Sequence, residues 1–101
     1  MINTDMRDHA YYLFGENNSY GQPKLIADEN GEAQIQGYVK MAINIASQYV
    51  QDSVIYGGAQ YMGLTHAELN DKYVIQYGDE KLKVLYVNPK GRFKQVFMAV
   101  M

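Results

Sequence analysis

The sequence predicts an all-β fold, a small antiparallel barrel or sandwich of about six to seven short strands, and two observations carry this prediction. Apolar and polar residues alternate in several short stretches, whereas the apolar spacing typical of helices is almost absent. Ten of the aromatic residues are tyrosines, which favour strands. A chain of 101 residues is long enough for one domain, residues 1–101, with one modest hydrophobic core.

The clearest strand is predicted over residues 38–45, where apolar side chains alternate with polar or small ones. This alternation predicts that one face of the strand lies in the core and that the other face meets solvent. The residues expected on the core face are Val39, Met41, Ile43 and Ile45.

The C-terminal third predicts three antiparallel strands, at residues 72–77, 81–87 and 92–100, which are rich in Val, Tyr, Ile and Phe. The segments between them, 77–81 and 88–92, have the length of hairpin turns. In the second turn, Pro89 suits the first central position and Gly91 can adopt the left-handed conformation. We therefore expect a three-stranded meander here.

The rest of the chain is less regular. Residues 8–14 predict a strand that ends at Gly15, followed by a loop over 16–21. A short strand over 24–26 then leads into a turn over 28–31. Further strands are predicted between residues 46 and 65, with a bend at the glycine pair 57–58. Residues 65–70 predict at most one short helical turn, with Thr65 and Glu68 forming a capping box.

Charge divides the chain into two halves. Residues 1–71 carry three Lys or Arg against nine Asp or Glu, whereas residues 72–101 carry six against two. Such polarity suits an assembly in which one chain presents opposite potentials to two neighbours.

The N-terminus lacks the pattern of a signal peptide, and no stretch has the length of a membrane span, so we expect a cytoplasmic protein with no membrane partner.

No motif predicts a catalytic or cofactor site, and we expect neither enzyme activity nor a metal or cofactor. His9 and His66 lack the neighbours of a zinc site, and the chain has no cysteine. A calcium loop beginning at Asp28 fails because Ala33 and Val39 occupy the positions of its glycine and final carboxylate. The glycine pair 57–58 is not followed by the lysine and helix of a phosphate-binding loop.

Basic residues among aromatic ones mark the C-terminal meander as a candidate interface. Such a pattern occurs on faces that bind single-stranded nucleic acid, and it also occurs on the solvent-facing wall of a barrel. The candidate basic interface consists of Lys81, Lys83, Lys90, Arg92 and Lys94.

As a whole, the chain resembles the head-completion proteins of long-tailed bacteriophages, the head-closure or stopper family of the head–tail connector. The resemblance covers nearly the whole length and rests on structural patterns without a catalytic signature. It is carried by residues 11–15 (YYLFG), 20–23 (YGQP), 38–45 (YVKMAINI), 55–65 (IYGGAQYMGLT), 71–75 (DKYVI), 83–88 (KVLYVN) and 92–98 (RFKQVFM).

The resemblance implies a small antiparallel β-barrel that assembles into a homo-oligomeric ring below the portal and adaptor. Such a ring retains the packaged double-stranded DNA, which it meets only by proximity, and docks tail-completion proteins. The location implied is the host cytoplasm during assembly and then the neck of the virion.

The family's plug is a mobile loop in the central channel, and two segments are candidates here, residues 16–37 and the region around the glycine pair 57–58. The first segment bears glycines that could act as hinges, and its carboxylates would repel phosphates. The candidate gating residues are Gly15, Glu16, Tyr20, Gly21, Asp28, Glu29, Gly31 and Glu32.

Three alternatives stay open. The chain could be a tail-completion or terminator protein of the same connector. It could also be a small intracellular β-barrel adaptor that binds a peptide on an exposed strand edge, or a single-stranded nucleic-acid-binding module.

Overall fold

The computed structural model describes residues 3–17, 23–46, 58–89 and 91–101. These residues form seven β-strands and no α-helix, which confirms the all-β prediction. The strands are β1 (Arg7–Asn17), β2 (Pro23–Leu25), β3 (Gly37–Ile45), β4 (Tyr61–Thr65), β5 (Tyr73–Tyr77), β6 (Glu80–Asn88) and β7 (Lys94–Val100). The strands predicted within residues 47–57 lie outside the described residues.

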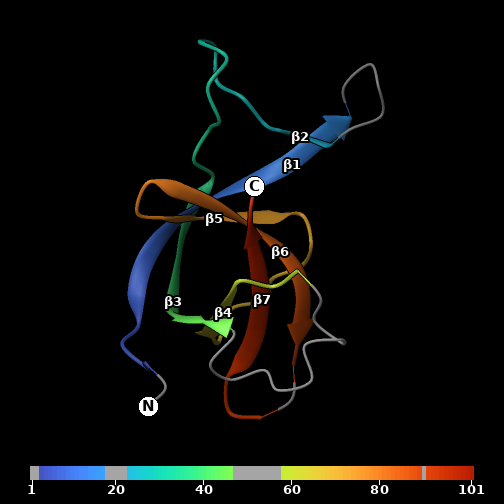
Figure 1. Ribbon diagram of the computed structural model, residues 1–101. Helices are drawn as coiled ribbons and strands as arrows, with labels where there is room; N and C mark the ends of the chain where they lie inside the picture. Colours follow the sequence, from blue (N-terminus) through green and yellow to red (C-terminus); the bar gives the residue numbers. More distant parts are fainter. Residues whose placement is uncertain (1–2, 18–22, 47–57, 90) are drawn as a thin grey trace.

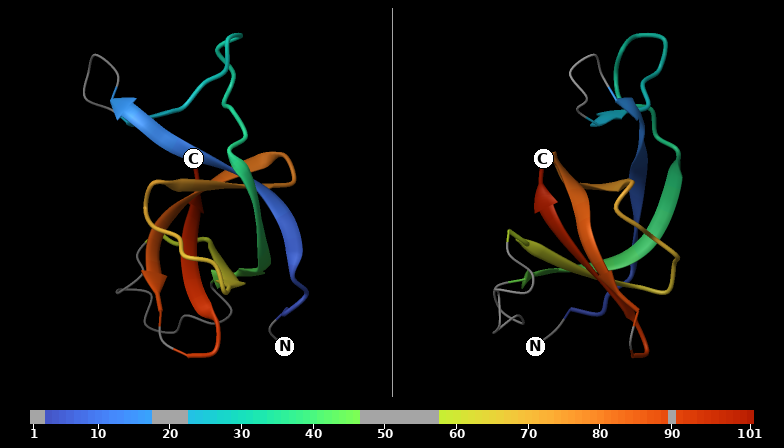
Figure 2. Two further views of the ribbon diagram at one scale, coloured as in Figure 1. Left: turned by 180° about the vertical axis from the view of Figure 1, so that it is seen from behind. Right: turned by 90° about the vertical axis from the view of Figure 1, so that its right-hand side faces the viewer.

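Six of the strands close into an antiparallel barrel (Figures 1 and 2). The order around the barrel is β1-β3-β4-β7-β6-β5, and the pairing of β5 with β1 closes it. Of the two architectures that the sequence allowed, the barrel is therefore the one formed. Closure satisfies the backbone groups of strands that would otherwise lie at the two edges of an open sheet.

β1 extends beyond the end of the barrel and pairs with three different strands along its length. Arg7 to Tyr11 pair with β3, and Tyr11 to Leu13 pair with β5. Beyond these residues, Phe14 and Asn17 pair with β2. The last part of β1 thus projects from the barrel and carries β2 with it (Figure 1).

The barrel interior is an apolar cluster whose buried residues come from four strands, β3, β5, β6 and β7. Its buried residues are Val39, Met41, Ile43, Ile75, Leu82, Val84, Val96 and Met98. Three of the four side chains predicted for the core face of β3 are among them.

The prediction for the fourth residue, Ile45, is wrong, because this residue is 50% exposed. Ile45 is the last residue of β3 and pairs with Tyr61, so it lies at the rim of the barrel. The ring of Tyr61 packs edge-on against that of Tyr77 at 5.4 Å. Tyr61, opposite Ile45 on β4, packs against the core cluster, whereas Ile45 at the strand end is half-exposed.

The opposite face of β3 is exposed at Tyr38 and Lys40, as predicted, but buried in its C-terminal half, where the prediction expected solvent. Ala42 is 1% exposed and belongs to a second cluster, outside the barrel, with Ala46, Met62, Leu64 and Phe97. Asn44 on the same face is buried as well, and it exchanges hydrogen bonds with Asn3. The N-terminal segment thus covers part of a sheet face that a lone strand pattern would leave open.

The predicted helical turn over 65–70 does not form. Thr65 is still in β4, paired with Lys94, and the chain leaves the strand through a bend. The Thr65 hydroxyl accepts a hydrogen bond from the Ala67 amide (3.1 Å) and donates one to the Lys40 carbonyl (2.7 Å). The Glu68 carboxylate, expected to complete a capping box, instead pairs with Lys94.

The C-terminal meander of β5, β6 and β7 is confirmed by its antiparallel pairing. Tyr77 pairs with Glu80 across a two-residue turn in which Gly78 has a φ of 59°. Gly91, between β6 and β7, has a φ of 95°, the left-handed conformation that the sequence predicted for it.

Candidate interaction surfaces

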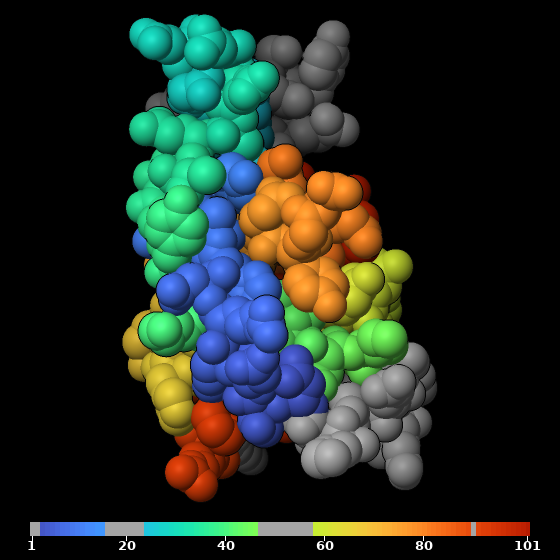
Figure 3. Space-filling model, turned by 90° about the vertical axis from the view of Figure 1, so that its left-hand side faces the viewer, coloured from blue at the N-terminus to red at the C-terminus, as the bar shows by residue number. Residues whose placement is uncertain are grey.

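The most prominent feature outside the barrel is an arm formed by residues 14–17 of β1, β2, and residues 26–36 (Figures 1 and 3). Backbone hydrogen bonds hold it. The Ile26 amide donates to the Leu13 carbonyl, and the Gln34 amide donates to the Ile26 carbonyl, each at 2.9 Å. A bridge between Ala27 and Ala33 closes a small hairpin at its tip. The segment predicted as a loop is therefore partly paired.

The tip of the arm is a tight acidic turn over residues 28–32. The Asp28 carbonyl accepts a hydrogen bond from the Gly31 amide (3.0 Å). The Asp28 carboxylate accepts from the amides of Asn30 (2.9 Å) and Glu32 (3.1 Å). The carboxylate of Asp28 thus stabilises the turn, whereas the side chains of Glu29 and Glu32 are exposed.

The candidate gating residues do not form one loop. Gly15 and Glu16 belong to β1, while Asp28, Glu29, Gly31 and Glu32 form the turn at the tip. Tyr20 and Gly21 lie outside the described residues. The arm presents its acidic residues on a hairpin that is tied to the barrel at its base.

Gly15 allows close packing within the arm. A Cβ atom on Gly15 would lie 2.9 Å from Cγ1 of Ile26, so the two segments of the arm approach more closely than a side chain would permit. Its φ is not in the left-handed region, unlike that of Gly31 at the tip, which is 81°. Where β1 meets Ile26, the arm is consequently packed, whereas Gly31 at the tip adopts a turn conformation.

Large apolar side chains are exposed on the arm and at its base. Ile26 is 38% exposed, Ile35 48%, and Tyr38, at the start of β3, 68%. The two isoleucines flank the acidic turn, so the arm combines apolar surface with negative charge. Neither isoleucine was among the candidate residues predicted from the sequence, although two isoleucines on either side of an acidic turn were a local signal for such a surface.

The candidate basic interface is split between the two ends of the barrel. Lys81 and Lys83, near the start of β6, lie beside the C-terminal end of β7, since Lys83 pairs with Ala99. Arg92 and Lys94 lie at the opposite end, where β7 begins (Figure 1). Lys90 lies outside the described residues.

Some of these cations are already engaged. Lys94 Nζ lies 2.9 Å from Glu68 Oε1 and donates to the His66 carbonyl (3.2 Å). Lys81 Nζ lies 5.3 Å from the centre of the Tyr12 ring, a cation–π contact. Lys83 is exposed and takes part in no ion pair within the part of the chain that the structure describes.

No protein-family model matches this chain, and neither a curated protein nor a solved structure matches it. Within the described ranges, no helix has the length and apolar character needed to cross a membrane.

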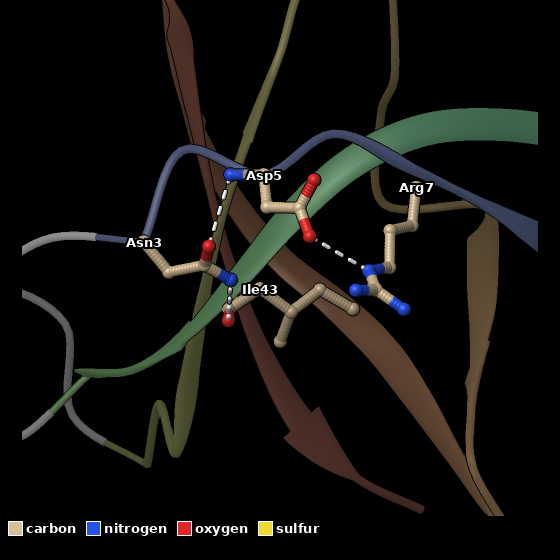
Figure 4. A network of polar contacts seen from close by, with 4 residues as sticks. All are labelled: Asn3, Asp5, Arg7 and Ile43. Carbon is tan, nitrogen blue, oxygen red and sulfur yellow. Dashed lines mark hydrogen bonds and ion pairs between the residues drawn. The ribbon is translucent and has the colours of Figure 1, made fainter.

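A cleft of about 340 Å³ opens between the N-terminal segment and Tyr77 at one rim of the barrel. The apolar side chains of Met41 and Ile43 border it. Figure 4 shows the polar contacts of its wall: Asn3 donates to the Ile43 carbonyl and accepts from the Asp5 amide, and the Asp5 carboxylate pairs with Arg7 at 2.8 Å. These contacts fix the N-terminal segment on β3.

The two histidines border different cavities. His9 lines the cleft just described, with Nδ1 3.3 Å from the Gln76 carbonyl oxygen. His66 lines a cavity of about 190 Å³ with Met6, Lys40 and Thr65, and its ring lies 4.7 Å from that of Phe93. Among the described residues, no three His, Asp or Glu side chains gather in a way that could hold a metal ion.

Proposed function

We propose that this chain is a structural subunit of the head–tail connector of a long-tailed bacteriophage, a head-completion protein that assembles into a ring, retains the packaged DNA and docks the tail. The observation that carries the proposal is the arm, which extends from a closed barrel and presents exposed apolar and acidic side chains. Exposed apolar surface rimmed by charge is typical of protein–protein contact sites.

The barrel supports the proposal because a ring subunit needs a rigid body. Its interior is filled by buried apolar side chains, and the pairing of β5 with β1 closes the sheet. The arm is anchored by backbone hydrogen bonds, such as that from the Gln36 amide to the Tyr11 carbonyl (2.9 Å). A neighbouring molecule can therefore be held at a fixed position relative to the barrel.

The acidic tip of the arm suits a surface next to DNA that must pass without being gripped. Glu29 and Glu32 are exposed and would repel the phosphate backbone. The proposal places residues 28–32 at the channel, as a plug that blocks DNA by its bulk and does not bind it. The function requires no catalytic residue or cofactor.

A second candidate, an adaptor that binds an extended peptide, is favoured by one observation. Among the described strands, β2 pairs with β1 alone and is last in the strand order, so its other edge could receive a strand. β2 has only three residues and begins with Pro23, however, and both features limit strand addition.

Electron microscopy of the purified chain, alone and with portal–adaptor complexes, tests the proposal. Rings of the chain, or a new layer on the adaptor, are the expected result. A protein that stays monomeric, adds no layer and takes up extended peptides would contradict the connector role and support the adaptor. A layer found on tail tubes only would assign the chain to tail completion.

A further inference from the structure

We infer that the arm of one copy binds the β6 face of the next copy, in a head-to-tail contact that repeats around the assembly. This inference rests on the proposed function, because it names the partner of the arm as a second copy of the chain. The β6 face is defined here by Lys81, Lys83, Leu85 and Tyr86.

The two surfaces match in charge. The arm presents the exposed carboxylates of Glu29 and Glu32, and the β6 face presents the exposed ammonium group of Lys83. Within the described part of the chain, none of these three groups enters an ion pair. Opposite charges on two surfaces of the same chain favour contact between unlike patches and disfavour contact between like patches.

Both surfaces also carry apolar side chains. Ile26 and Ile35 are exposed on the arm, and Leu85 is 37% exposed on β6. Leu85 lies where the register between β6 and β7 shifts, between Val84 and Tyr86, so it has no direct partner across the pair. A bulge of this kind turns a side chain away from the regular strand surface.

The geometry places the arm and the β6 face at the same end of the barrel. Lys83 pairs with Val74, and Val74 pairs with Tyr12, two residues before the arm begins. The C-terminus, whose Met101 amide donates to the Lys81 carbonyl, lies at this end as well (Figure 1). A contact between copies that lie side by side in one layer requires the arm and the β6 face to lie at the same level, and this arrangement meets that requirement.

A contact between two different patches has a direct structural consequence. Each copy donates its arm to one neighbour and receives an arm from the other, so the contact generates a ring if the rotation closes and a filament if it does not. Contact between two identical patches would end at a dimer.

The chain lacks cysteine, so introduced cysteines report this contact without background. We would oxidise the full chain carrying Glu32→Cys and Lys83→Cys together, both free at high concentration and assembled on portal–adaptor complexes. The expected result is a ladder of disulfide-linked multimers larger than a dimer. The matched control joins Glu32→Cys with Arg92→Cys, at the opposite end of the barrel, and should give no ladder.

Three results would overturn the inference: no ladder in either preparation, a ladder only with the Arg92 control, or efficient dimers from either single variant.

As a second readout, Glu32→Lys and Lys83→Glu should each abolish higher oligomers, and the double reversal should restore them. Rings without the ladder would refute this contact and leave the connector role standing. A ladder without rings or connector binding would support the contact and refute the role.

Discussion

The thioether of Met41 on β3 fills the space that a side chain on Gly63 of β4 would need. The Cγ atom of Met41 lies 2.8 Å from the position of a Cβ on Gly63, and its sulfur lies closer still. Gly63 pairs with Ile43, so the missing side chain is on the wall of the barrel beside the core. Glycine in this strand allows a fully buried methionine to fill the interior.

Gly63→Ala should therefore destabilise the protein by about 1–3 kcal/mol, because the added methyl group overlaps Met41 and forces it from its position. Denaturant unfolding measures the loss. The same substitution in a Met41→Ala background should cost much less, since the space is then empty. Equal costs in the two backgrounds would show that the two side chains do not compete.

Ile43→Ala should cost about 2–4 kcal/mol, because Ile43 is buried in the barrel core. Ile45→Ala is the matched control: it removes the same atoms from the same strand at a half-exposed rim, and should cost less than about 1 kcal/mol. Thermal or denaturant unfolding of the two variants compares them directly. Similar losses would mean that the two positions are equally packed.

The contrast between Ile43 and Ile45 shows how much of the burial along a strand can be predicted from its own sequence. Alternation located β3 and placed Val39, Met41 and Ile43 correctly, because a period of two follows from strand geometry alone. It failed at Ile45, the last residue of β3, which is half-exposed opposite Tyr61 of β4. Burial at a strand end depends on partners that the strand's own sequence does not contain.

The candidate sites divide in a similar way. The acidic turn at 28–31 and the C-terminal meander could be predicted, because their signals are local. The sequence pattern grouped Lys81, Lys83, Arg92 and Lys94 into one interface, but the structure separates them between the two ends of the barrel. This separation could not be predicted, because closeness in sequence does not decide which end of a strand a residue occupies. The arm depends on the pairing of β1 with three strands, a consequence of closure that no single segment reveals.

The ion pair between Lys94 and Glu68 should contribute little to stability. Glu68 has a side chain that is 92% exposed, so solvent screens the attraction, and Glu68→Gln should cost less than about 1 kcal/mol. Unfolding measured at low and high salt should show the difference shrinking as salt rises. A cost well above this value that is insensitive to salt would indicate a packing role for Glu68.

The chain should contain no stoichiometric metal. His9 and His66 border separate cavities, and the carboxylate of Asp28 is engaged by two backbone amides in its turn. Elemental analysis of protein purified without an affinity tag, with thermal unfolding before and after a chelator, checks this expectation. Bound zinc or calcium, or a melting temperature lowered by the chelator, would contradict it.

The plug role of the arm tip can be separated from the integrity of the arm. Ala27 and Ala33 are bridge partners, so replacing residues 28–32 with Asn-Gly should retain the hairpin on a two-residue turn and remove only the tip. Introduced into a phage that encodes the chain, this change should give filled heads that carry the connector ring and still leak DNA. Heads without the ring would instead reflect loss of the contact between the arm carboxylates and Lys83 of the next copy. DNA retention is measured by nuclease sensitivity of purified particles.

A length-matched control distinguishes bulk from charge. Glu29→Gln with Glu32→Gln keeps the turn, whose hydrogen bonds come from Asp28 and the backbone, and removes two exposed carboxylates. The variant also removes the carboxylates that the inferred contact places against Lys83 of the next copy, so formation of the connector ring is checked first by electron microscopy. In particles that carry the ring, a plug that acts by its bulk should retain DNA, and leakage would show that the carboxylates themselves contribute to the barrier. Full retention by the Asn-Gly particles would exclude residues 28–32 as the plug, and the region around the glycine pair 57–58 would then be the remaining candidate.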